Sequence, residues 1–159
     1  MRIEIDIPTQ MLTLFDEGGA VLREYSVSTS KNGPGEHAGS FCTPRGEHVI
    51  RDKIGGGRVE NTVFVARRPT GEVWSPELAT EQPERDWILS RILWLCGREP
   101  GVNRFGEVDS MRRYIYIHGT PDTEPMGEPR SIGCIRMRNV DVMDLFERVA
   151  AGTPVVIKA

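Results

Sequence analysis

The start of the chain constrains its fold most strongly, because apolar and charged residues alternate there. Ile3, Ile5 and Ile7 are separated by single charged residues. A period of two is typical of a β-strand with one buried face and one face in water. Residues 12–15 lead through two glycines into the β-rich segment 21–27, which predicts a hairpin. The chain therefore begins as a sheet.

Turn-forming and β-forming segments continue this pattern. Residues 28–45 are rich in Ser, Gly and Pro, which predicts a long surface loop. The segments that we predict as further strands are 47–51, 61–67, 113–118 and 154–158. The first two of these are separated by the glycine turn at residues 55–57.

Two segments predict helices. Residues 86–96 are apolar on most sides, with Asp86 as an N-cap and Gly97 as a stop, which indicates a largely buried helix. Asn139 can cap a second helix that stops at Gly152. The apolar residues of this second segment fall at helical spacing and are Val142, Leu145, Phe146 and Val149.

The predicted elements define a fold class. Strands dominate and do not alternate with helices, so we expect an α+β, mainly β fold with a sandwich-like arrangement and two main helices. The chain has 159 residues, which suits one core. We therefore predict a single domain over residues 1–159.

Charge and hydropathy exclude several classes of partner. The formal net charge is -3, and acidic and basic residues are interspersed, so we expect no nucleic-acid partner. The basic pair Arg67-Arg68 is interpreted as a solvated strand end. We find no run of about 18 apolar residues and no signal-like apolar region, so we expect no membrane span. We accordingly expect a cytoplasmic location, or a periplasmic one if an export signal has been removed.

The cysteines and histidines are scattered. Three cysteines are an odd number, so at least one thiol is free. Their wide spacing fits neither a disulfide framework nor a C-x-x-C site, and no two histidines lie at the helical spacing of a zinc motif. We expect no metal site.

Cys134 is the candidate nucleophile. It follows Gly133, between a proline-rich loop and the capped helix. Glycine permits unusual backbone angles and a close approach of substrate, and successive N–H groups at such a turn can bind an oxyanion. The alternative, a small buried core residue, is accepted for Cys42 and Cys96.

His118 is the candidate base. A cysteine thiol becomes nucleophilic when an imidazole takes its proton. His118 precedes Cys134 by sixteen residues and ends an apolar strand, where Gly119 allows close approach. A histidine that merely hydrogen bonds at a strand end is the alternative.

These segments resemble a known family. Tyr114–Thr120 (Tyr-Ile-Tyr-Ile-His-Gly-Thr) and Ser131–Met137 (Ser-Ile-Gly-Cys-Ile-Arg-Met) are similar to the signature of L,D-transpeptidase (YkuD-type) catalytic domains. Upstream, Tyr25–Ser30, Thr43–Gly46 and Arg91–Leu95 also resemble family segments, so the resemblance covers nearly the whole chain.

The resemblance implies acyl transfer on peptidoglycan. Cys134 would attack the carbonyl of the third residue of a stem tetrapeptide, usually a diamino acid, and expel the terminal D-alanine. His118, oriented by a backbone carbonyl, would be base and then acid, and the N–H groups of Gly133 and Cys134 would form the oxyanion hole. The other residues implied at the substrate site are Arg136, Ser131, Gly119, Tyr116 and Ile132. No cofactor is implied.

One position departs from the family pattern. Ile132 stands where many members carry histidine before the Gly-Cys pair, so we expect a more apolar pocket beside Cys134 and a different acceptor preference. The loop Thr120–Arg130, with three prolines, would form a stiff wall at the site or a plain surface connection.

The thioacyl intermediate leaves more than one outcome open. Water would give an L,D-carboxypeptidase acting on soluble muropeptides in murein recycling, which we favour for a chain without a signal. An amine would give a transpeptidase that forms cross-links. An inactive wall-binding module is an alternative of another class, whereas a papain-like protease is disfavoured because there the cysteine precedes its histidine. The oligomeric state stays undetermined.

Overall fold

The computed structural model describes all residues from 1 to 159. The ten strands are β1 (Arg2–Asp6), β2 (Met11–Phe15), β3 (Val21–Ser28), β4 (Gly46–Ile54), β5 (Thr62–Val65), β6 (Arg68–Val73), β7 (Ile88–Gly97), β8 (Tyr116–Thr120), β9 (Ile135–Arg138) and β10 (Pro154–Lys158). The helices are α1 (Pro76–Glu81), the short 3₁₀ helix η1 (Gly106–Val108) and α2 (Asn139–Arg148).

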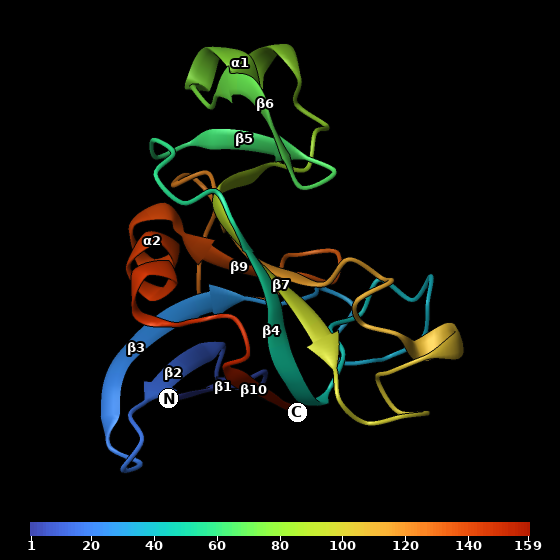
Figure 1. Ribbon diagram of the computed structural model, residues 1–159. Helices are drawn as coiled ribbons and strands as arrows, with labels where there is room; N and C mark the ends of the chain where they lie inside the picture. Colours follow the sequence, from blue (N-terminus) through green and yellow to red (C-terminus); the bar gives the residue numbers. More distant parts are fainter.

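One sheet closes on itself. Its strand order is β4-β10-β1-β2-β3-β9-β8-β7-β5-β6, and β4 pairs in addition with β7. This pairing joins the two long strands that cross the front of the molecule in Figure 1. The fold is mainly β, as predicted, but the sheet is barrel-like and not a sandwich. The ladders on β7 shift register at two places, and such irregularities help a sheet to curve and close.

The first three strands confirm the pattern in the sequence. Ile3 and Ile5 are fully buried, while their charged neighbours face outward. β2 and β3 form the predicted hairpin around Gly19, whose φ is 86°. Strand β10 runs parallel to β1, so Lys158 near the C-terminus lies beside Asp6, at the end of β1 away from the N-terminus (Figure 1).

The predicted helix at residues 86–96 is wrong, because this segment is β7. Both faces of this strand are covered: Leu93 and Leu95 lie in the main core, whereas Ile92 lies in a second cluster with Phe64. A strand that is buried on both sides has a continuous apolar run, which periodicity alone does not distinguish from a buried helix. The first helix is instead α1, capped by the Ser75 side chain.

Other predicted bounds also shift. The predicted strand 61–67 contains β5 and then a turn, after which β6 forms an unpredicted partner strand. The predicted strand 113–118 begins later, because Tyr114 adopts a positive φ of 56°. Helix α2 confirms the second predicted helix and buries Val142, Leu145 and Phe146.

Asn139 does not cap α2 with its side chain, contrary to the prediction. Its amide nitrogen donates to Thr120 O at 2.9 Å, and its amide oxygen accepts from Ser90 Oγ at 2.6 Å. The fully buried Asn139 side chain therefore ties α2 to β7 and β8.

Alternation divides the residues of β8 and β9 between two environments. Ile117 and Ile135 are paired across the strands and point into the main core. Tyr116 and Cys134 belong to the separate cluster on the outer face, which the β5–β6 hairpin covers through Phe64. The candidate active site is built on this outer face. None of the helices is long and apolar enough to cross a membrane.

Candidate active site

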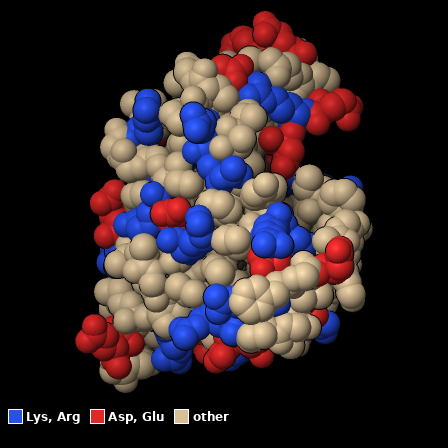
Figure 2. Space-filling model, turned by 45° about the vertical axis from the view of Figure 1, so that its right-hand side comes forward, with Lys and Arg blue, Asp and Glu red and all other residues tan.

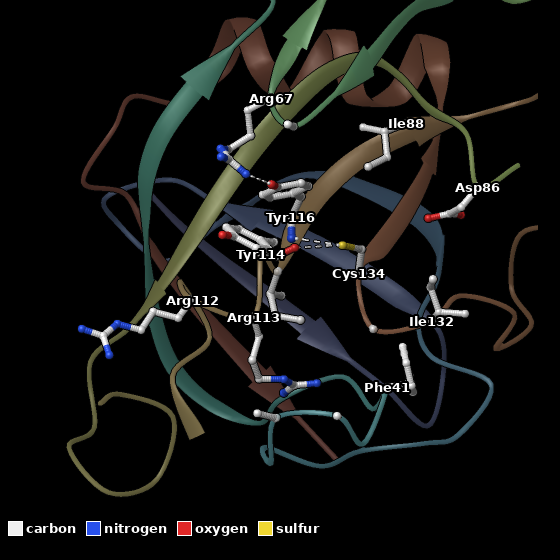
Figure 3. A pocket seen from close by; sticks show the side chains of 15 residues that line it. Phe41, Arg67, Asp86, Ile88, Arg112, Arg113, Tyr114, Tyr116, Ile132 and Cys134 are labelled. Carbon is white, nitrogen blue, oxygen red and sulfur yellow. Dashed lines mark hydrogen bonds between the residues drawn. The ribbon is translucent and has the colours of Figure 1, made fainter. Parts of the chain in front are cut away.

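Cys134 lies directly before β9. Its Sγ accepts a hydrogen bond from the Tyr116 N–H at 3.3 Å and donates one to Tyr114 O at 3.4 Å (Figure 3). The thiol is therefore held against the start of β8 by two backbone groups. Gly133 has a φ of 136°, a conformation that a residue with a Cβ rarely adopts.

The turn before Cys134 is fixed from inside. The buried Ser131 hydroxyl donates to Cys134 O at 2.6 Å and accepts from the Gly133 N–H at 3.2 Å. Thr43, from the long loop after β3, donates its hydroxyl to Gly133 O at 2.9 Å. These bonds leave the Cys134 N–H without a protein acceptor, while the Gly133 N–H is already engaged.

His118 lies on the same outer face as Cys134. It is opposite Arg136 in the β8–β9 register, and Arg136 is two residues beyond Cys134. Its Nδ1 donates to Gly119 O at 2.6 Å, which leaves Nε2 as the basic nitrogen. The imidazole is only 1 % exposed and forms no hydrogen bond with the thiol.

Burial sets the protonation of both groups. It raises the pKa of the Cys134 thiol to about 12, an effect that the Tyr116 N–H partly offsets. Burial lowers the pKa of His118, and the nearby Asp86 carboxylate acts in the opposite direction. Burial therefore favours the uncharged form of both groups.

Arg136 forms an ion pair with Asp86, at 2.9 Å between Nη2 and Oδ1. The Asp86 charge raises the pKa of both Cys134 and His118, whereas the Arg136 charge lowers both. The ion pair therefore leaves the site with nearly balanced local charge.

A cavity of about 660 Å³ opens at Cys134. Its wall is apolar near the thiol, where Phe41, Ile88 and Ile132 contribute, and carries three arginines farther along (Figure 3). A smaller hollow of about 260 Å³ shares Asp86 and Ile132 with it and is lined mainly by polar residues. Ile132 thus lies between the two spaces.

The structure separates the predicted site residues into two groups. Cys134, Gly133, Tyr116 and Ile132 line the cavity, and Arg136 lines the smaller hollow. The other predicted residues, His118, Gly119 and Ser131, are buried and line neither space.

The position of Gly119 explains why it is glycine. A Cβ there would lie 2.5 Å from Asn139 Oδ1 and 2.6 Å from Leu89 O. The predicted close approach at Gly119 is therefore to the protein's own atoms.

Asp86, Arg67, Arg113 and Tyr114 are among the cavity residues that were not predicted from the sequence. Asp86 was interpreted as a helix cap, and Arg67 as a solvated strand end. Nothing local marks either residue, because each reaches the site through strand pairing with distant segments. Tyr114 lies in the same family-like segment as His118. This closeness in sequence to a candidate catalytic residue was the only feature that could have predicted Tyr114 at the site.

Comparisons with known proteins place the chain in a family. A model of the YkuD family, the L,D-transpeptidase catalytic domain, matches residues 1–157. The chain therefore belongs to this family.

Individual relatives agree with this assignment. The putative L,D-transpeptidase YqjB of Bacillus subtilis is 47% identical over 45 residues, which are 28% of this chain and 26% of that protein. An L,D-transpeptidase from Mycobacterium smegmatis matches in structure with a TM-score of 0.55 at 20% identity, over 99% of this chain and 58% of that one. An L,D-transpeptidase mutant from Enterococcus faecium gives 0.59 at 16% identity, over 98% and 48%. The chain spans about half the length of these solved proteins, whose likeness shows the fold.

Proposed function

We propose that this protein transfers acyl groups of peptidoglycan stem peptides through Cys134. The observation that carries the proposal is the thiol itself, which lies in a peptide-sized cavity on the same face as an imidazole with a free Nε2. Family membership supports the peptide substrate. The bond broken joins the third residue of a tetrapeptide to its terminal D-alanine.

The neutral resting pair defines the proposed order of proton transfers. As Cys134 Sγ attacks the carbonyl carbon, its proton passes to His118 Nε2. The oxyanion then collapses, the C–N bond breaks, and the imidazolium gives its proton to the departing amine of D-alanine. A thioacyl-enzyme remains. The thiol must first leave Tyr114 O, and catalytic hydrogen bonds commonly tighten only when substrate binds.

The Cys134 N–H is the principal oxyanion donor in this proposal, because it has no other acceptor. The Gly133 N–H would join it by exchanging its bond to Ser131 Oγ for the substrate oxygen. Arg136 acts as a positioning residue that holds Asp86 at the rim of the cavity.

Water is the proposed acceptor, which makes the protein an L,D-carboxypeptidase for soluble muropeptides of murein recycling, in the cytoplasm. The supporting observation is the small second hollow. At about 260 Å³ it falls below the usual size of a ligand pocket, so it suits water better than a second stem peptide. Hydrolysis breaks the C–S bond, leaves a tripeptide carboxylate and returns a proton to the thiol through His118.

Transpeptidation is the second candidate, because the same hollow shares Asp86 and Ile132 with the cavity of the thiol and also carries Glu124. These carboxylates could attract the amine of an acceptor. An exported, periplasmic protein would meet such acceptors in the polymer. The Thr120–Arg130 loop restricts them: Gly127 N and Arg130 N are hydrogen bonded to the β3 strand and its extension, so this wall is anchored.

The deciding experiment offers a soluble disaccharide-tetrapeptide with and without an added D-amino acid, and follows products by mass spectrometry. Tripeptide alone supports hydrolysis. An exchanged or cross-linked product supports transpeptidation.

The controls separate an enzyme from an inactive wall-binding module. Cys134→Ala should remove all product, whereas Cys96→Ala should retain it, because Cys96 lies on β7 outside the cavity. If no product depends on Cys134, and a thiol probe labels the three cysteines equally, the binding-module alternative is favoured.

A further inference from the structure

The turn between β5 and β6 has an unfavourable backbone. Val65 pairs with Arg68, so Ala66 and Arg67 form a two-residue turn, and their φ angles are 49° and 63°. Turns of this kind favour Asn-Gly or Gly-Gly, because residues with a Cβ are strained at positive φ. Local strain of this kind concentrates at functional sites.

This backbone carries the Arg67 side chain to the cavity. Its guanidinium lies 4.8 Å from the Trp94 ring centre. It also lies 4.7 Å from the Tyr114 ring centre, and Nη1 donates to Tyr116 Oη at 2.9 Å (Figure 3). The aromatic contacts and the hydrogen bond fix the orientation of the guanidinium without neutralising it. The other N–H groups form no hydrogen bond within the protein.

The charges around this end of the cavity are unbalanced. Arg67, Arg112 and Arg113 line it, and none has a carboxylate within 4.0 Å. The only acid in the lining is Asp86, which is paired with Arg136. Basic side chains also gather across the middle of the face shown in Figure 2.

The three arginines are not equivalent. Arg113 already donates to three backbone carbonyls, those of Gly35, Glu36 and Cys42. Arg112 is exposed, and its bond to Asp109 comes from the backbone N–H and not from the guanidinium. Arg67 alone is both held in place and left with free donors, and a planar guanidinium suits bidentate binding of a carboxylate.

Tyr116 contacts both the Arg67 guanidinium and the Cys134 thiol, so its length sets the separation between them. Its N–H binds Cys134 Sγ, and its phenol oxygen binds Arg67. The guanidinium is therefore one tyrosine side chain away from the atom that attacks the peptide. A carboxylate bound there belongs to a group remote from the bond that breaks.

We propose that Arg67 selects donors whose acyl residue carries a carboxylate at the far end of a long side chain. This inference rests on the proposed acyl transfer at Cys134 and names its substrate class. The fitting residue is a diamino dicarboxylic acid such as meso-diaminopimelate. Lysine, or diaminopimelate with an amidated side-chain carboxyl, lacks the anion.

The test compares two donor tetrapeptides that differ in one group, the free or the amidated side-chain carboxyl of diaminopimelate at the third position. The release of D-alanine gives kcat/KM for each. We expect the unaltered protein to prefer the free acid by about 10- to 100-fold, the range expected for a charge-assisted hydrogen-bonded pair.

Three variants separate recognition from structure. Arg67→Asn suits the positive φ of the turn but removes the charge, so the preference should disappear through loss of activity on the free acid alone. Arg67→Lys keeps the charge and should retain part of the preference. Arg68→Asn is the matched control, because Arg68 is exposed and lies outside the cavity, and it should change neither rate.

The outcomes distinguish this inference from the proposed function. If Arg67→Asn lowers kcat/KM equally for both donors, Arg67 acts structurally or binds the D-alanine carboxylate, and the inference is overturned. Equal rates for both donors with the unaltered protein would also overturn it. If neither donor gives a Cys134-dependent product, the proposed acyl transfer itself fails.

Discussion

The two halves of the barrel differ in regularity. Within β1, β2, β3 and β10 no residue has a positive φ, and the inward side chains are fully or almost fully buried. The half that carries the site is distorted at several points. Ser90 within β7, Tyr114 before β8, and Ala66 and Arg67 in the covering hairpin all have positive φ without being glycine.

The difference separates residues that contribute to stability from residues that line the candidate active site. The regular half supplies stability through apolar burial and has little chemistry. The distorted half holds the Cys134 thiol, just before β9, and the Arg67 guanidinium, in the β5–β6 turn, at positions that regular strands would not give. Strain of about 1–3 kcal/mol per residue persists only where the surrounding structure holds it in place.

The largest expected effect is on chemistry in the distorted half. Cys134→Ala should lower D-alanine release by at least about 10³-fold, because no other group can form the acyl intermediate. His118→Gln should do nearly the same, since Nε2 is the proposed base. Thermal unfolding should stay close to that of the unaltered protein for Cys134→Ala. Substantial turnover in either variant would contradict the assigned roles.

The next effect is on stability in the regular half. Ile5 is fully buried on β1, so Ile5→Ala should lower the free energy of unfolding by about 2–5 kcal/mol. The rate per folded molecule should be almost unchanged, because β1 does not contribute to the cavity. Denaturant unfolding and active-site titration of the folded fraction measure the two quantities. A large loss of rate with unchanged stability in Ile5→Ala would contradict the division between a stabilising half and a half that carries the site.

A smaller effect concerns the pH dependence of Cys134. Its pKa is raised to about 12, so the thiol is the dominant form at neutral pH and the thiolate fraction grows with pH. Alkylation by iodoacetamide should accelerate by about tenfold per pH unit between about pH 6 and pH 9. A plateau near neutral pH would instead indicate a preformed thiolate–imidazolium pair. Cys134→Ala identifies the background from the other two cysteines.

The smallest effect tests strain in the covering hairpin. Ala66→Gly relieves a positive φ and should stabilise the protein by up to about 1 kcal/mol. Ala79→Gly is the contrasting variant, because Ala79 lies within α1 and glycine should cost about 0.5–1 kcal/mol there. Denaturant midpoints compare the two. The same sign for both would show that the turn is not strained.

Prediction from the sequence succeeded where one local signal was sufficient. The strands β1, β2, β3 and β10 and the helix α2 each have a periodicity that reflects one buried face. The roles of Cys134 and His118, which follow from residue chemistry and the resemblance to a family, stay predictions. Arg136 was named as well, although its partner Asp86 was not.

Prediction failed where two faces are covered. The apolar run of β7 has the barrel interior on one side and the hairpin on the other, so it shows no period of two. The β5–β6 hairpin that covers β7 also carries Arg67, whose place in the cavity could not be predicted from the sequence. Its position over Trp94 depends on the pairing of β5 with β7, which brings together segments more than twenty residues apart.

The sequence by itself determined a mainly β chain and its regular half, because these properties depend on local side-chain pattern. It also supplied Cys134 and His118 as the candidates for acyl transfer. Only the tertiary structure decided that the sheet closes through β4 and β7, that residues 88–97 are a strand, and that Arg67 and Asp86 reach the cavity of Cys134. Local periodicity indicates whether one face of a strand or helix is exposed or buried. It does not indicate which distant segment covers that face, because strand pairing and barrel closure determine the covering segment.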